Sequence, residues 1–160
     1  MWTYTSKNSY PDIILHDCTI ERVRLEKQDI VFEFNDRGFW ITEDNTQNPF
    51  KKTLRTGKAE LRLTNIDLNS LTINVYNELR FAWRKLFTTK KKTSLADFAA
   101  KINSGKWAFE FVDEYYGYKC AMFCGYIHTN KKPYLIEMQM EISYEESQYS
   151  WNKIYEDRTW

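Results

Sequence analysis

The chain has 160 residues, of which 42% are hydrophobic and 28% charged, and its net charge is +1. This size and composition are those of a folded domain with a sizeable core, and they exclude a disordered chain. The 5 glycines and 3 prolines exclude collagen-like segments and glycine-rich phosphate loops, whereas the 17% of aromatic residues favours β-strands.

The N-terminal residues and the apolar runs bear on the location of the protein. Residues 1–11 lack the apolar core of a secretory signal peptide. The longest run without a strongly polar residue, Cys120–Ile127, is far shorter than the ~20 residues that span a bilayer. We therefore expect a cytoplasmic protein that is not inserted in a membrane. We also expect one globular domain over residues 1–160 and three reduced cysteines.

The first half of the chain predicts several short strands with apolar residues at alternate positions. They cover residues 12–25, 29–35, 39–41, 59–65 and 71–76. A change of phase near Glu21 predicts a bend or bulge in the first strand. The residues Asp36-Arg37-Gly38 predict a hairpin, residues 42–52 a long loop, and the short connection at 65–70 a pairing of the strands on either side of it.

Residues 77–89 fit a helix and a strand equally well, because Leu79, Ala82, Trp83 and Leu86 have helical spacing and Leu79, Phe81 and Trp83 alternate. We favour a helix or irregular structure there. The next segment is clearer. Ser94 followed by Asp97 resembles a capping box, an apolar stripe continues to Ile102, and Gly105 is a suitable stop. This pattern predicts a short amphipathic helix at about 94–103.

Three consecutive strands are predicted at residues 106–113, 118–128 and 134–143, which form an antiparallel meander. Tyr115-Tyr116-Gly117 and residues 130–133 are the expected turns. Gly125 indicates a bulge or a close approach of another backbone. Residues 1–10 and 145–160 are polar enough to be loosely ordered, although Tyr149, Trp151 and Tyr155 could dock the second segment as a final strand.

Together these elements predict a mainly β (α+β) fold. It is an antiparallel β-sandwich or partly closed barrel of about eight strands, with the helix covering one face or end.

The charges are unevenly distributed along the chain. Residues 51–106 carry a net charge of +9, and the segments before and after them carry −4 each. The basic excess is greatest in a candidate interaction surface of six residues: Arg80, Arg84, Lys85, Lys90, Lys91 and Lys92. We expect these to be surface charges, with Phe81, Trp83 and Phe87 between them at least partly buried.

Catalytic and metal motifs are weak in this sequence. Cys120, Cys124 and His128 lie on one strand and would spread over more than ~20 Å, so they cannot converge on one ion. His16, Cys18 and His128 could form a mixed metal site, but buried free cysteine is the simpler interpretation. Cys120 or Cys124 beside His16 or His128 is the one candidate nucleophile–base pair. We expect no enzymatic activity, cofactor or metal.

Three hypotheses for function follow. The first is a non-catalytic interaction module that binds another protein. The second is a nucleic-acid-binding domain that uses the basic and aromatic residues 80–92. The third is a β-domain that encloses a small apolar ligand between residues such as Met122, Met138 and Trp107. In general character the chain resembles bacterial and phage interaction proteins of the accessory or immunity-like type, and this likeness rests on no particular residue.

Overall fold

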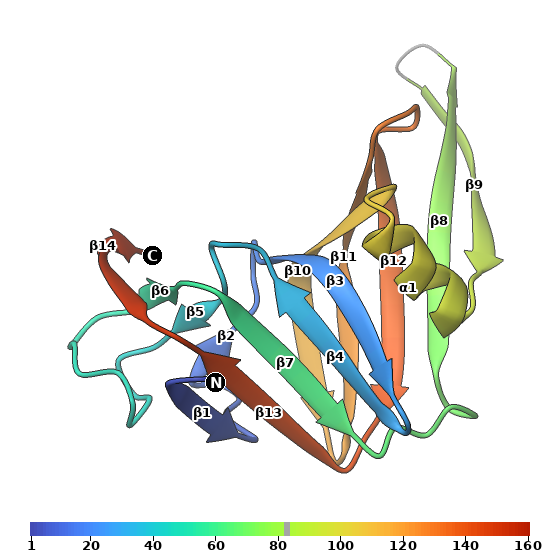
Figure 1. Cartoon of the computed structure of the whole chain (residues 1–160). Helices are drawn as coiled ribbons and strands as arrows, with labels where there is room; N and C mark the ends of the chain where they lie inside the picture. Colours follow the sequence, from blue (N-terminus) through green and yellow to red (C-terminus); the bar gives the residue numbers. More distant parts are fainter. Residues whose placement is uncertain (82–83) are drawn as a thin grey trace.

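The computed structural model describes residues 1–81 and 84–160 and, for residues 79–81 and 84–87, the backbone only. The described residues form fourteen strands and one helix, α1 (Leu95–Asn103) (Figure 1). The strands are β1 (Tyr4–Lys7), β2 (Ile13–Ile14), β3 (Thr19–Glu26), β4 (Asp29–Phe34), β5 (Trp40–Ile41), β6 (Leu54–Thr56), β7 (Ala59–Thr64), β8 (Thr72–Phe81), β9 (Arg84–Lys92), β10 (Trp107–Gly117), β11 (Cys120–Thr129), β12 (Leu135–Ser143), β13 (Glu146–Trp151) and β14 (Ile154–Thr159).

All strand pairs are antiparallel, and the strands form two sheets. The larger sheet has ten strands in the order β1-β13-β7-β4-β3-β10-β11-β12-β8-β9, and the smaller has four in the order β14-β6-β5-β2. The mainly β, antiparallel fold with one short helix is therefore confirmed, with more strands than predicted. The larger sheet is open, because β1 and β9 are its edges.

The larger sheet curls back on itself around the core. Three strands separate β10 from β13 in the sheet, yet the hydroxyl groups of Tyr116 in β10 and Tyr149 in β13 are 3.1 Å apart. Phe32 of β4 meets Phe111 and Phe123 edge-on, with 6.4 Å between ring centroids in each pair. The core therefore lies inside the curve, where aromatic rings from both halves of the sheet interlock.

The predicted meander is confirmed, with one turn displaced. β11 pairs along its length with β10 and β12, and a bulge interrupts β10 between Phe111 and Asp113. A Cβ atom at Gly125 would lie 2.0 Å from the carbonyl oxygen of Glu110, which is the close approach that glycine predicted. The turn expected at Tyr115–Gly117 was wrong. Gly117 still pairs with Cys120, and the chain turns at Tyr118 and Lys119 instead.

The first half confirms the strands but not all of the pairings. The predicted bulge in β3 lies between Ile20 and Arg22. The hairpin at Asp36–Gly38 was wrong, since β4 pairs with β3 and β7 whereas β5 belongs to the smaller sheet. The reason is local: the Thr56 N–H donates to the Phe39 carbonyl, and the Phe39 N–H donates to the Thr56 side-chain oxygen, which draws the chain into the second sheet.

The pairing expected between β7 and β8 was also wrong. β7 pairs with β4 and β13, whereas β8 pairs with β12 and β9. The connection between β7 and β8 crosses the ends of other strands. There the Ile66 N–H donates to Gln28 and the Asp67 N–H donates to Ser143. Alternation of apolar residues predicts the faces of a strand but not its neighbours.

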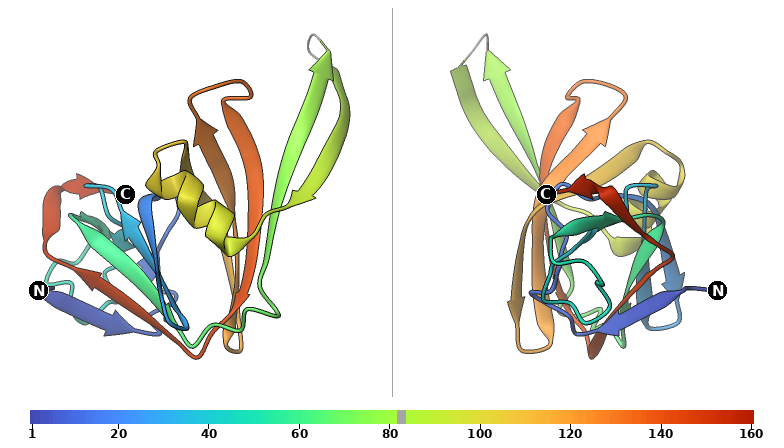
Figure 2. Two further views of the ribbon diagram at one scale, coloured as in Figure 1. Left: turned by 45° about the vertical axis from the view of Figure 1, so that its right-hand side comes forward. Right: turned by 90° about the vertical axis from the view of Figure 1, so that its left-hand side faces the viewer.

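The helix or irregular structure favoured at residues 77–89 was wrong for the described part of that segment, which forms the strand given as the alternative. β8 continues to Phe81, and β9 begins at Arg84 and pairs with it. β8 is paired with β12 up to Tyr76, which lies opposite Glu137, and it continues as a strand beyond that point. The resulting hairpin projects beyond the rest of the molecule (Figure 2).

The helix α1 occupies the position where β3 and β10 separate. These two strands share only the pairs Phe109–Ile20 and Glu110–Thr19, and α1 packs against both of them. Ser94 is the N-cap and accepts the Asp97 N–H at 3.1 Å, as the capping pattern predicted. Gly105 follows the helix with φ +68°. The apolar stripe of α1 is buried in the core.

The C-terminal segment is docked in the fold, one of the two alternatives given for it. β13 lies between β1 and β7, and the side chains of Tyr149 and Trp151 are fully buried. β14 pairs with β6 in the smaller sheet. The only helix among the described residues is α1, which is too short to cross a membrane.

Candidate binding site

The end of α1 and the start of β10 place a tryptophan beside several lysines. Phe98 of α1 packs against Trp107, with ring centroids 6.4 Å apart, and this contact fixes the indole at the margin of the core. Lys101, one turn further along the helix, places its amine 4.1 Å from the centre of the Trp107 ring. Lys106 immediately precedes the tryptophan, so that this corner presents two cations around one aromatic ring.

The loop between β11 and β12 completes the site. Trp107 pairs with Thr129 at the end of β11, which brings residues 130–133 over the tryptophan. The Thr129 hydroxyl donates to the carbonyl oxygen of Pro133 at 2.7 Å, and the Asn130 amide donates to Gly105 at 3.4 Å. These bonds fix the loop to the strand and to the end of the helix.

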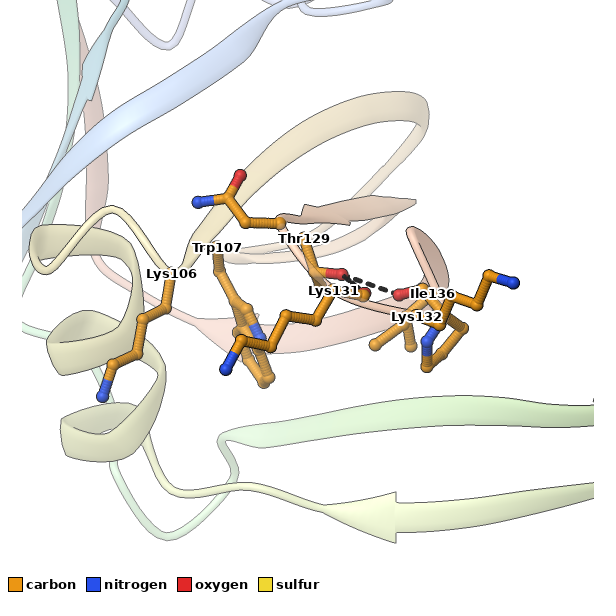
Figure 3. Close-up of a pocket in the computed structure, with 8 residues that line it drawn as sticks. Lys106, Trp107, Thr129, Lys131, Lys132 and Ile136 are labelled. Carbon is orange, nitrogen blue, oxygen red and sulfur yellow. Dashed lines mark hydrogen bonds between the residues drawn. The ribbon is translucent and has the colours of Figure 1, made fainter.

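The result is a cavity of about 400 Å³, which we call the lysine pocket (Figure 3). Its lining residues are Lys106, Trp107, Thr129, Asn130, Lys131, Lys132, Pro133 and Ile136. The side chains of Lys106, Trp107 and Lys131 extend to the same side of it (Figure 3). Among the described residues, the lining contains three cations, an indole and an aliphatic side chain, and no carboxylate, so the pocket suits an anionic ligand with an apolar part.

The cations of the lysine pocket differ from those elsewhere in the sheet. On β3 and β7, Arg24 contacts Glu26, Glu33 and Glu60, and Arg62 contacts Glu26 and Asp29. These arginines are neutralised within the fold. In the part of the chain that the structure describes, Lys101 and the three lysines of the pocket make no ion pair, so their charge is available to a ligand.

The structure describes the side chains of only part of the predicted interaction surface. Lys90, Lys91 and Lys92 are exposed on β9, as expected. The side chains of Arg80, Arg84 and Lys85, and those of Phe81, Trp83 and Phe87, lie outside the described residues. A second cavity of about 800 Å³ shares Lys132 and Pro133 with the lysine pocket and includes Tyr76 of β8, which pairs with Lys90. Lys90 places its amine 5.8 Å from the Tyr76 ring centre.

The candidate metal ligands Cys18, His16 and His128 do not form one group, and each contacts other residues of the fold. Cys18 is buried, and its thiol donates to the carbonyl oxygens of Ile14 and His16. His16 bonds through Nδ1 to the Val112 carbonyl, whereas His128 contacts Glu110 at 2.9 Å. Within residues 1–81 and 84–160, no group of three metal-ligating side chains is placed to hold an ion.

The cysteines are unpaired, as expected, and two of them are poor nucleophiles. Burial raises the pKa of the Cys18 thiol to about 12, although Arg55 nearby favours the thiolate. The pKa of Cys124 is also raised, mainly by burial and further by Asp113 and Glu137. Since the thiolate is the reactive form, neither cysteine is activated at neutral pH.

The residues proposed to line an apolar ligand cavity do not share one. Met138 is fully buried and Trp107 lines the lysine pocket, whereas Met122 is partly exposed on the opposite face of the sheet. The face is set by register, because Met122 pairs with Glu141 while its neighbour Phe123 pairs with the buried Met140. That grouping of residues was wrong.

Sequence reasoning missed the lysine pocket. Lys106 was recognised only as the start of a strand, Trp107 only as a strand residue that could line an apolar cavity, and Lys131 and Lys132 only as turn residues. Their proximity depends on the pairing of Trp107 with Thr129, 22 positions apart in the chain. A cation next to an aromatic residue at a strand start, facing a basic turn, is the signal that could have identified it.

Comparison with known proteins adds no functional information. The chain matches no known protein family, and no curated protein and no solved structure is significantly similar to it.

Proposed function

We propose that this protein is a non-catalytic interaction module that binds an acidic segment of another protein at the lysine pocket. One observation carries the proposal: Lys106, Lys131 and Lys132 line the pocket with Trp107 and Ile136, without a carboxylate among the lining residues that the structure describes. Complementary charge steers partners together and fixes their register, while a partly buried aromatic anchor supplies affinity. A peptide with carboxylates and apolar side chains has both complements.

Two observations favour a protein partner over a nucleic acid. Single-strand binding uses several aromatic faces on which bases stack. Here Trp107 is the one aromatic residue that lines the pocket in the described part of the chain, and the amine of Lys101 lies over its ring. The net charge of +1 is also low for a nucleic-acid-binding domain.

Fluorescence polarisation tests the proposal with a labelled 12-residue peptide of alternating glutamate and valine. The controls are the same peptide with lysine for glutamate and a random single-stranded oligonucleotide. We expect the acidic peptide alone to bind at ~50 mM salt, and to bind more weakly at ~200 mM salt because exposed charges are screened. The Lys131→Glu/Lys132→Glu variant should weaken binding about tenfold, since two attractions become repulsions.

A matched variant, Lys51→Glu/Lys58→Glu, changes the net charge equally at two exposed lysines outside the pocket. It should alter the affinity less than about twofold, because charges beyond a Debye length are screened. Trp107→Ala should weaken binding without changing its salt dependence. Equal effects of the two double variants, or no binding of the acidic peptide, would refute the proposal. Tighter binding of the oligonucleotide that depends on Lys131 and Lys132 would replace it with the nucleic-acid hypothesis.

A further inference from the structure

Strand β9 is an open edge of the larger sheet. It is the last strand in the sheet order, and its hydrogen-bonded neighbour is β8 (Figure 1). The hairpin that it forms with β8 projects away from the body of the protein (Figure 2). Residues 88–92 are all exposed. The side of β9 away from β8 is therefore accessible to an extended chain.

The direction of the backbone groups along β9 follows from one bond. The Thr93 N–H donates to Ile73 of β8 at 2.9 Å. In an antiparallel pair, backbone groups point to the neighbouring strand at every second residue. The backbone N–H and C=O groups of Lys91 and Thr89 therefore point towards β8, as those of Thr93 do. Thr88, Lys90 and Lys92 direct their N–H and C=O groups outward, and no hydrogen bond of the described residues occupies them.

The side chains of the same residues present positive charge on both faces of the edge. Lys90 and Lys92 pair with Tyr76 and Asn74 on the outer face, whereas Lys91 pairs with Val75, which faces the core. None of the three lysines makes an ion pair among the described residues. A strand added at this edge would place its side chains directly opposite them, where opposite charges stabilise and like charges destabilise pairing.

This charge pattern selects among the possible occupants. A second copy of the chain, pairing β9 with β9, would place lysines against lysines, and edge lysines are a common protection against such self-pairing. An acidic strand would instead gain both the backbone bonds and the ion pairs.

We propose that the acidic segment of the partner binds in extended conformation and adds to the larger sheet beside β9 and antiparallel to it, as the other strands of this sheet pair. Carboxylates of the segment lie opposite Lys90 and Lys92. The inference rests on the proposed function and specifies the form of the bound segment. Lys132 and Pro133 line both the lysine pocket and the second cavity, and Tyr76 of the second cavity lies beside Lys90, so the two binding regions adjoin.

Backbone methylation of the acidic peptide tests this arrangement. When glutamates lie opposite Lys90 and Lys92, their own N–H groups bond to β9, and the valine N–H groups point away. A peptide N-methylated at its glutamates should therefore bind at least about tenfold more weakly than the unmodified peptide. The same peptide N-methylated at its valines should bind within about twofold of it.

A protein variant tests the same bond from the other side. Lys90→Pro removes an N–H that points outward and leaves the ladder with β8 intact, as edge strands permit. It should weaken peptide binding more than Lys90→Ala, which removes the same charge and keeps the N–H. Thermal unfolding establishes that both variants fold; if Lys90→Pro does not, the methylated peptides decide.

The outcomes separate the two proposals. Binding of the unmodified peptide with equal affinity for both methylated forms, or with any other order than the one expected, overturns strand addition and leaves the proposed function standing. Failure of the unmodified peptide to bind overturns both. Affinity that depends on the methylation of glutamate but not on Lys90, Lys91 or Lys92 overturns the assignment to β9.

Discussion

At the scale of single residues, Glu114 joins three parts of the chain. Its Oε1 accepts the Leu15 N–H at 2.8 Å, and its Oε2 accepts the Tyr116 hydroxyl at 2.7 Å. Tyr116 in turn lies 3.1 Å from the hydroxyl of Tyr149. Burial raises the pKa of the Glu114 carboxyl, despite these hydrogen bonds and the nearby His16, which favour the charged form. The carboxylate is thus held in place while being poorly solvated.

The raised pKa predicts a pH dependence of stability. A carboxyl with a higher pKa in the folded state binds more protons when folded, so its contribution to stability is largest below the unfolded pKa of about 4.5 and declines as pH rises through the folded pKa. We expect Glu114→Gln, which keeps an acceptor for Leu15, to lose this decline. Urea unfolding from pH 4.5 upward measures it, and parallel pH profiles for the two proteins would contradict the prediction.

Removing the acceptor has a separate effect. Glu114→Ala leaves the Leu15 N–H without its partner, which should lower the free energy of unfolding by about 1–3 kcal/mol at every pH. Glu114→Gln is the matched control, because it retains the amide oxygen.

At the scale of elements, α1 is joined to β3 by a side chain that bonds to the β3 backbone where a neighbouring strand would otherwise pair. The Asn103 Oδ1 accepts the Val23 N–H at 2.8 Å, and its Nδ2 donates to the Val23 carbonyl at 2.8 Å. Val23 lies beyond the short region in which β3 pairs with β10. The amide therefore satisfies the backbone at the point where the sheet opens, and it fixes the helix that carries Lys101.

This role predicts a graded loss of stability. Asn103→Ala leaves both backbone groups of Val23 unpaired and should lower the free energy of unfolding by about 1–3 kcal/mol. Asn103→Asp keeps the acceptor but places a carboxylate against the Val23 carbonyl, so it should also destabilise the protein. Chemical denaturation of the three proteins measures the order. Wild-type stability in Asn103→Ala would show that water replaces the amide and that α1 is held by its apolar stripe alone.

At the scale of the whole molecule, the sequence predicts local structure better than long-range pairing. The strand at 134–143 is evident because Ile136, Met138, Met140 and Ile142 alternate with polar residues, and burial of one face follows directly. The neighbours of β7 are not evident, because β4 and β13 are brought to it by the curl of the sheet.

The candidate site could likewise be predicted from the sequence only in part. The exposure of Lys90–Lys92 follows from their clustered charge. The lysine pocket depends on which residue lies opposite Trp107, and the edge position of β9 depends on the order of ten strands. Neither leaves a local pattern in the sequence.

The edge of the larger sheet predicts the association state of the protein. Lys90, Lys91 and Lys92 keep two copies of β9 apart by repulsion, and without them an open edge with free backbone groups is a template for pairing. We expect the triple variant Lys90→Thr/Lys91→Thr/Lys92→Thr to associate, because threonine has a high strand propensity and no charge. Analytical ultracentrifugation should give an average mass that rises with concentration and exceeds that of the wild type. The triple variant Lys51→Thr/Lys52→Thr/Lys58→Thr removes the same charge away from this edge, so it should sediment as the wild type does. Equal association of both triple variants would show that net charge, rather than the edge of β9, controls self-pairing.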